Sequence, residues 1–144
     1  MRKFQNLEIW HKSHKLTLDI YEITRKQFPK DELYALTSQI RRASASIPTN
    51  IAEGCGRKTN QEFVRFLHIA SGSATEVEYQ LLLAKDLQYI APTTYEDLNR
   101  KIVEIRKMII SFIKKIPNEK NTLPDSSLTF SQHESQASCL EPGA

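Results

Sequence analysis

SIPTNIAEGCGRKTNQEF, residues 46 to 63, combines signals that continue, bend and stop a helix. Pro48 stands inside an apolar pattern with steps of three and four: Leu33, Leu36, Ile40, Ala43, Ile47 and Ile51. An interior proline removes a backbone hydrogen bond and costs about 3 kcal/mol, but a new helix would keep this phase only by accident. We predict one helix kinked at Pro48, with Ser44, Ser46 and Thr49 satisfying carbonyls near the bend.

The second half of the stretch predicts a turn and a new helix start. Gly54 or Gly56 is expected in the left-handed conformation that closes a helix, so that GCGRK forms a tight interhelical turn. Thr59-Asn60-Gln61-Glu62 has the Thr-x-x-Glu form of a capping box. The sequence therefore predicts two helices joined at residues 54–58.

Working outward, the amphipathic pattern predicts a first helix over residues 7–27, which ends because the residue before Pro29 is pushed out of the helical region. Asp31 is expected to cap the second helix. In the third helix, the small residues around Gly72 predict the close approach of another helix. The pattern Thr93-Thr94-Tyr95-Glu96 predicts a capping box for the fourth helix, which Pro117 ends.

Four amphipathic segments with short connections predict an all-α fold, an antiparallel up-down-up-down four-helix bundle over residues 1–117. Residues 118–144 are Ser-rich, acidic and poor in core-forming residues, so this tail is expected to be disordered. The first, third and fourth helices carry apolar residues outside a narrow seam, and a second copy of the chain could cover some of them.

The chain has a net charge of +3, but its charged residues are unevenly distributed along the sequence. Residues 118–144 hold one lysine against four acidic residues, a net charge of −3, which leaves +6 on residues 1–117. A basic body is compatible with nucleic-acid binding, although scattered lysines also serve simply as a solvated surface. No apolar run reaches the roughly 18 residues that a membrane span needs, so we expect a cytoplasmic protein without a membrane partner.

A polar stripe follows the second helix at steps of three and four: Gln39, Arg42, Ser46, Asn50 and Glu53. One interpretation is a specific surface for RNA or a partner protein. The other is an internal hydrogen-bond network or subunit contact, with Arg42 pairing with Ser46 and Asn50 with Glu53.

Three basic residues are candidate phosphate contacts: Arg41, Arg57 and Lys58. The last two follow Gly56 immediately before a predicted helix start, where backbone amides can bind an anion. A plain turn explains the same residues, and the absence of a preceding strand and of GKS or GKT argues against a nucleotide-binding loop.

Patterns for catalysis are lacking. Glu8-Ile9-Trp10-His11 is a single Glu-x-x-His element, whereas a di-iron bundle needs two. Cys55 has no histidine placed nearby by the sequence. We expect no catalytic, metal or cofactor residues and no enzyme activity.

Several segments together resemble the four-helix bundle family encoded by 23S rRNA intervening sequences. They include Gln39-x-Arg41-Arg42-Ala43, Ser46-Ile47-Pro48-x-Asn50-Ile51-Ala52-Glu53-Gly54 and Ala70-x-Gly72-Ser73-x-x-Glu76, within a match over about residues 4–116. The sequence departs from the commoner pattern at Ser13-His14 and Ala35, positions that affect packing.

That family is similar in fold to accessory variability proteins of diversity-generating retroelements, which form homopentamers and bind a reverse transcriptase and RNA. The resemblance implies a noncatalytic homo-oligomer that associates with RNA or a ribonucleoprotein, and a homopentamer is one form of assembly that it suggests. The alternative hypothesis is a protein-only scaffold without nucleic-acid binding.

Overall fold

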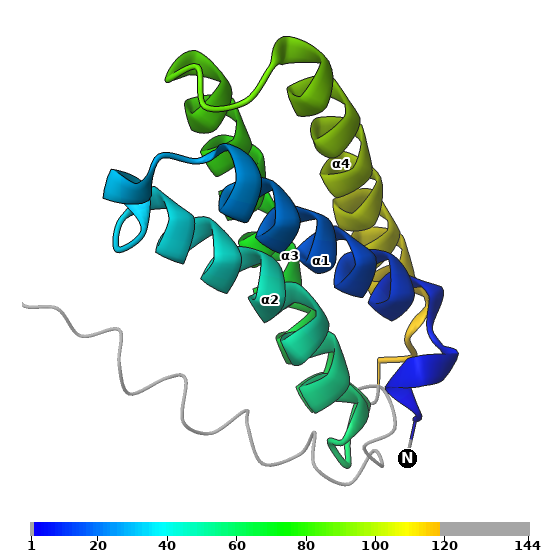
Figure 1. Cartoon of the computed structure of the whole chain (residues 1–144). Helices are drawn as coiled ribbons and strands as arrows, with labels where there is room; N and C mark the ends of the chain where they lie inside the picture. The colour runs from blue at the N-terminus through cyan, green and yellow to red at the C-terminus, as the bar shows by residue number, and fades with distance from the viewer. Residues whose placement is uncertain (1, 119–144) are drawn as a thin grey trace, which may run out of the picture.

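The computed structural model describes residues 2–118, in which all regular structure is helical (Figure 1). The four α-helices are α1 (Glu8–Gln27), α2 (Leu36–Cys55), α3 (Asn60–Asp86) and α4 (Pro92–Lys115). Two short 3-10 helices, η1 (Phe4–Asn6) and η2 (Lys30–Glu32), precede α1 and α2. The all-α prediction with four helices is therefore confirmed, and the predicted disordered tail lies outside the described residues except for Asn118.

Each helix packs against the next one along the chain, and α1 also contacts α4. The faces that meet carry the predicted apolar residues, and the most deeply buried large side chains come from all four helices: Leu16, Ile20, Ile40, Ile47, Ile51, Phe63, Leu67, Leu81, Leu98, Ile102, Ile105 and Ile109. The helical periodicity thus identified the core correctly.

Two predicted helix starts are wrong. α2 begins at Leu36 instead of near Asp31, because Lys30–Glu32 forms the turn η2 and Ala35 adopts φ −121° and ψ −108°. Glu32 provides the hydrogen-bond acceptor at the start of α2: its Oε2 accepts from the Leu36 amide at 3.0 Å. α4 begins at Pro92, where proline's fixed φ suits a first helical position, so the Thr93 capping box is not used.

α2 continues through Pro48, and its neighbour α1 supplies a hydrogen-bond donor in place of the backbone N–H that proline lacks. Pro48 has no N–H to offer the Ser44 carbonyl four residues earlier. The hydroxyl of Thr17 donates to that carbonyl at 3.0 Å and also lies 2.9 Å from the Ser13 carbonyl. Ser44 Oγ does bond a carbonyl, that of Arg41, but the donor for the carbonyl exposed by Pro48 comes from another helix.

The glycines of the α2–α3 turn act differently from the prediction. Neither has a positive φ, so the left-handed prediction for Gly54 and Gly56 is wrong. Gly54 is needed for space: a Cβ there would lie 2.8 Å from Phe63 Cδ1 and 3.0 Å from Phe66 Cβ. The Thr59 half of the predicted capping box is confirmed, since its Oγ1 accepts from the Glu62 amide at 3.1 Å. The Glu62 carboxylate pairs with Arg57 and Arg65 instead.

Gly72 faces outward, and a Cβ at this position would meet nothing within 4 Å. The close approach of helices instead uses Ala70 and Ala74, which are fully buried, while Ser73 contacts α2. The small residues around Gly72 therefore do lie where another helix packs closely on α3, as predicted, although Gly72 itself takes no part in that contact.

Polar contacts join segments that are distant in sequence at each end of the bundle. At one end Asn60, the first residue of α3, accepts from Arg2 at 2.9 Å and donates to the Pro117 carbonyl at 3.4 Å. At the other end the Tyr89 hydroxyl donates to Glu32 at 2.9 Å. The N-terminal segment, the α2–α3 turn and the end of α4 therefore lie together at one end.

Candidate functional site

The polar stripe on α2 is divided between an internal network and an exposed surface. Asn50 Nδ2 donates to the Ser46 carbonyl at 2.8 Å and lies 2.9 Å from Ser46 Oγ. Ser46 Oγ in turn bonds Ser73 Oγ on α3 at 2.9 Å. These two stripe residues thus belong to a half-buried network that joins α2 to α3.

The other three stripe residues, Gln39, Arg42 and Glu53, are exposed. Within residues 2–118 the structure shows neither the Arg42–Ser46 nor the Asn50–Glu53 pair, because Asn50 turns toward Ser46. The exposed three remain available to a partner, whereas the network serves the packing of the bundle.

Gln80 adds an unusual feature to α3. Its side chain is 4% exposed, and Oε1 has no hydrogen-bond partner in the described part of the chain. Its Nε2 donates to Glu76 over 3.4 Å. Because buried polar atoms are normally paired, this oxygen indicates a place where a further donor would stabilise the protein.

Arg41 does not join the other candidate phosphate contacts. Its Nε donates to Thr24 Oγ1 on α1 at 2.8 Å, and its guanidinium carbon lies 4.9 Å from the centre of the Tyr21 ring. The helix between Arg41 and the α2–α3 turn is roughly 20 Å long at 1.5 Å per residue. Arg41 therefore fastens α2 to α1, while Arg57 and Lys58 form part of a separate site.

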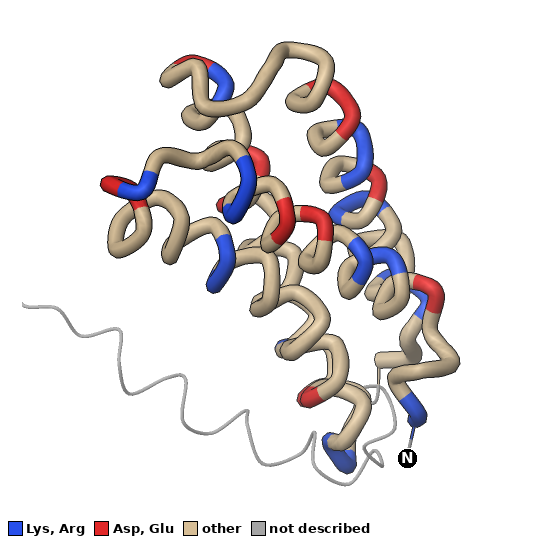
Figure 2. Tube along the Cα trace, in the orientation of Figure 1, with Lys and Arg blue, Asp and Glu red and all other residues tan. Residues whose placement is uncertain are grey.

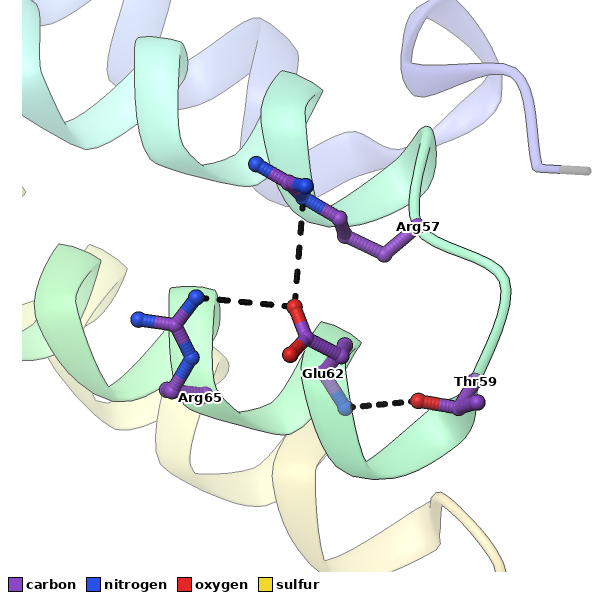
Figure 3. A network of polar contacts seen from close by, with 4 residues as sticks. All are labelled: Arg57, Thr59, Glu62 and Arg65. Atoms are coloured by element: carbon purple, nitrogen blue, oxygen red, sulfur yellow. Dashed lines mark hydrogen bonds and ion pairs between the residues drawn. The ribbon is translucent and has the colours of Figure 1, made fainter.

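The α2–α3 turn presents two arginines around one carboxylate (Figure 3). Glu62 Oε2 lies 4.0 Å from Arg57 Nε and 3.5 Å from Arg65 Nη2. Both guanidinium carbons also lie over the Phe66 ring, at 4.7 and 4.6 Å from its centre. Since all three charged side chains are about half exposed, the cluster faces solvent.

Charge is unevenly distributed between the two ends of the bundle (Figure 2). The end with the α2–α3 turn, residues 2–8, 53–65 and 112–118, holds seven Lys or Arg and three Glu, a net charge of +4. The opposite end, residues 22–38 and 79–98, holds four Lys or Arg and six acidic residues, a net charge of −2. Arg57, Lys58 and Arg65 therefore lie in a basic end.

The chain matches the sequence model of one known protein family. The sequence model described as 23S rRNA-intervening sequence protein matches residues 5–111. The chain belongs to this family. The match includes all eight predicted site residues, so the polar stripe and the α2–α3 turn both lie inside the family region.

A solved structure supports the same assignment for this member of the intervening sequence family. It is a protein with unknown function from the S23 ribosomal protein family of Bacteroides thetaiotaomicron, 32% identical in sequence, with a TM-score of 0.66. The similarity covers 74% of this chain and 98% of that one. A comparison with curated proteins found no match.

Other features of this family member offer less to a ligand. A groove of about 360 Å³ between α1 and α4 contains cations, but most are already paired: Lys12 with Glu104 at 2.5 Å and Lys101 with Asp19 at 3.5 Å. Burial raises the pKa of the Cys55 thiol, which disfavours the reactive thiolate. No helix in the part of the chain that the structure describes has the length and apolar character to cross a membrane.

Sequence reasoning missed three residues near the start of α3: Glu62 as an ion-pair partner, Arg65 and Phe66. The spacing of Glu62 and Arg65 is a recognisable helical pair signal. The contact between Arg57 and Glu62 could not be predicted from spacing, because it depends on the direction in which α3 leaves the turn.

Proposed function

We propose that this family member is a noncatalytic, cytoplasmic, oligomeric adaptor that associates with RNA or with a ribonucleoprotein such as a reverse transcriptase complex. The observation that carries the proposal is the net charge of +4 at the α2–α3 end of the bundle, against −2 at the other end. Such a gradient attracts a polyanion and orients it toward one end. Membership of a family named for 23S rRNA intervening sequences supports the choice of RNA.

Binding to RNA should depend steeply on salt. Neutralising phosphates releases counterions, so the logarithm of the association constant falls linearly with the logarithm of salt concentration, by about 0.7 for each phosphate contacted on a single strand. Fluorescence anisotropy with a labelled RNA hairpin at several salt concentrations measures this slope. Affinity that is absent at low salt, or equal at low and high salt, would refute the RNA proposal.

Self-association forms the second part of the proposal, and exposed apolar residues on α3 support it. Tyr79 is 62% and Leu82 38% exposed, and the outward Gly72 leaves space for a close neighbour. We propose that another copy of the chain covers this part of α3.

Replacing both Tyr79 and Leu82 with serine should weaken the assembly on the order of tenfold or more, because each side chain loses apolar burial. Sedimentation velocity over a range of concentrations gives the assembly mass. The matched control is Leu33→Ser with Tyr34→Ser, which removes two exposed apolar side chains from outside the helices. A monomeric parent chain, or equal masses for the two variants, would contradict the proposal.

The alternative function is a protein-only scaffold, which the exposed apolar residues of α3 also favour. It predicts an oligomer that shows no RNA affinity at any salt concentration. The anisotropy and sedimentation measurements together therefore separate the two functions.

The proposal includes an antiparallel up-down-up-down course of the helices and a kink of α2 at Pro48. Contacts between each helix and its successor, with short connections, support the first. Interior prolines commonly bend helices, which supports the second. An experimental structure with parallel neighbours or a straight α2 would contradict the corresponding part.

A further inference from the structure

We propose that Arg57 and Arg65 form a binding site for a phosphate group of the RNA backbone, in which the Glu62 carboxylate takes the place of the phosphate when RNA is absent. The inference rests on the proposed RNA association and gives it a specific site. The cluster combines two guanidinium groups and one shared carboxylate (Figure 3). The ring of Phe66 lies beneath both guanidiniums and supports them.

The two guanidiniums are only partly used within the chain. Each has five N–H donors, yet both approach the same oxygen of Glu62, at 4.0 and 3.5 Å. Strong pairs between a guanidinium and a carboxylate have N to O distances of about 2.7–2.9 Å. Exposed pairs of this kind contribute at most about 1 kcal/mol, so a stronger anion can displace or join the carboxylate at little cost.

Phe66 holds both guanidiniums close to their binding positions. Their carbons lie 4.7 and 4.6 Å from the centre of its ring, and the ring itself is only 6% exposed. Stacking on an aromatic ring restricts the long arginine side chains before a ligand arrives. A bound anion therefore loses less affinity to ordering these side chains than it would with free arginines.

A phosphodiester can engage the two guanidiniums more fully than Glu62 does. Its two non-bridging oxygens can each accept from a different guanidinium, whereas Glu62 reaches both arginines through one oxygen. The neighbouring Lys58 adds an exposed cation in the turn, and the surrounding end carries a net charge of +4. In the α1–α4 groove, by contrast, nearby acids already neutralise most cations.

Glu62→Gln provides the sharpest test, because it removes the competing charge while keeping the size of the side chain. We expect the affinity for a labelled RNA hairpin to rise about two- to fivefold, in line with the loss of an exposed ion pair. Glu8→Gln is the matched control, since it removes one exposed negative charge from the same end without touching this cluster or the polar stripe. Equal affinities for the two variants would overturn the inference.

The converse test replaces both arginines with glutamine. The variant should bind the hairpin about tenfold or more weakly, and its salt slope should be shallower by about 0.7, the contribution of one phosphate. Arg25→Gln with Lys30→Gln is the control, because it removes two cations from the acidic end. Circular dichroism establishes that each variant keeps its helices.

Three further results have defined meanings. If the parent chain binds RNA with the expected salt slope but the cluster variants match their controls, the site is wrong and the proposed function stands. If the parent chain binds no RNA, both fail. Inorganic phosphate and an acidic peptide are tested as competitors against unlabelled RNA, at equal concentrations of phosphate and of negative charge respectively. If either competes as well as unlabelled RNA does, the assignment of the site to the RNA backbone is overturned.

Discussion

Replacing Phe63 with alanine is expected to lower the free energy of unfolding by about 3–5 kcal/mol. The side chain is fully buried, and its ring makes an edge contact with Phe112 at 5.9 Å between centres. It also fills the space beside Gly54 and lies under the guanidinium of Arg2, whose carbon is 4.5 Å from the ring centre. Truncation would leave a cavity where α2, α3, α4 and the N-terminal segment meet.

Chemical denaturation followed by circular dichroism measures this loss, at a fixed protein concentration because assembly also stabilises the fold. Tyr34→Ala is the control: its side chain is 92% exposed, so we expect a change within about 0.5 kcal/mol. A loss below about 1 kcal/mol for Phe63→Ala would show that this junction is not tightly packed.

The sequence predicted the helices and their buried faces because those depend on periodicity. The register from Leu36 to Ile51 passed through Pro48 unchanged, and the helix does continue there. Leu33 is the exception: it fitted the same register but is 46% exposed, because η2 and Ala35 precede the helix. Periodicity alone does not locate the point at which a helix begins.

Helix ends were predicted less well, since several side chains can satisfy the same backbone groups. Gln88, two residues beyond the end of α3, has a φ of 63°, the single positive φ of a non-glycine residue in residues 2–118. The Tyr89 amide bonds the Ala84 carbonyl and the Gln88 amide bonds the Lys85 carbonyl, which is a Schellman ending. No glycine in the sequence marks this position, whereas Gly54, which looked like such a marker, serves close packing.

Only part of the candidate site was predicted, because spacing along one helix does not show which residues of other helices it contacts. Spacing placed the stripe on one face of α2, but the partner of Ser46 is Ser73 on α3, and spacing within one helix contains no information about that contact. Arg57 and Lys58 were found from their place in the turn. The sequence did not show that Arg41 belongs to a different site. The packing of α1 on α2 places Thr24 and Tyr21 beside Arg41, and this contact separates Arg41 from Arg57 and Lys58.

Replacing Thr17 with valine is expected to lower the free energy of unfolding by about 1–3 kcal/mol, because it leaves the buried Ser44 carbonyl without the hydroxyl that lies 3.0 Å away. Valine keeps the branched shape, so packing changes little. Thr75→Val is the matched control: the Thr75 hydroxyl bonds the Ser71 carbonyl at 3.3 Å on an exposed helix face. We expect that control to change stability by no more than about 0.5 kcal/mol.

Pro48→Ala provides the decisive comparison, since alanine restores the N–H that the Ser44 carbonyl lacks. In that background the Thr17→Val substitution should cost less than in the parent chain, and denaturation of all four proteins gives the coupling between the two positions. The hydroxyl of Thr17 would then account for how α2 tolerates an interior proline. If Thr17→Val costs the same with proline and with alanine at position 48, the hydroxyl does not compensate for the missing amide, and the tolerance of Pro48 must come from packing alone.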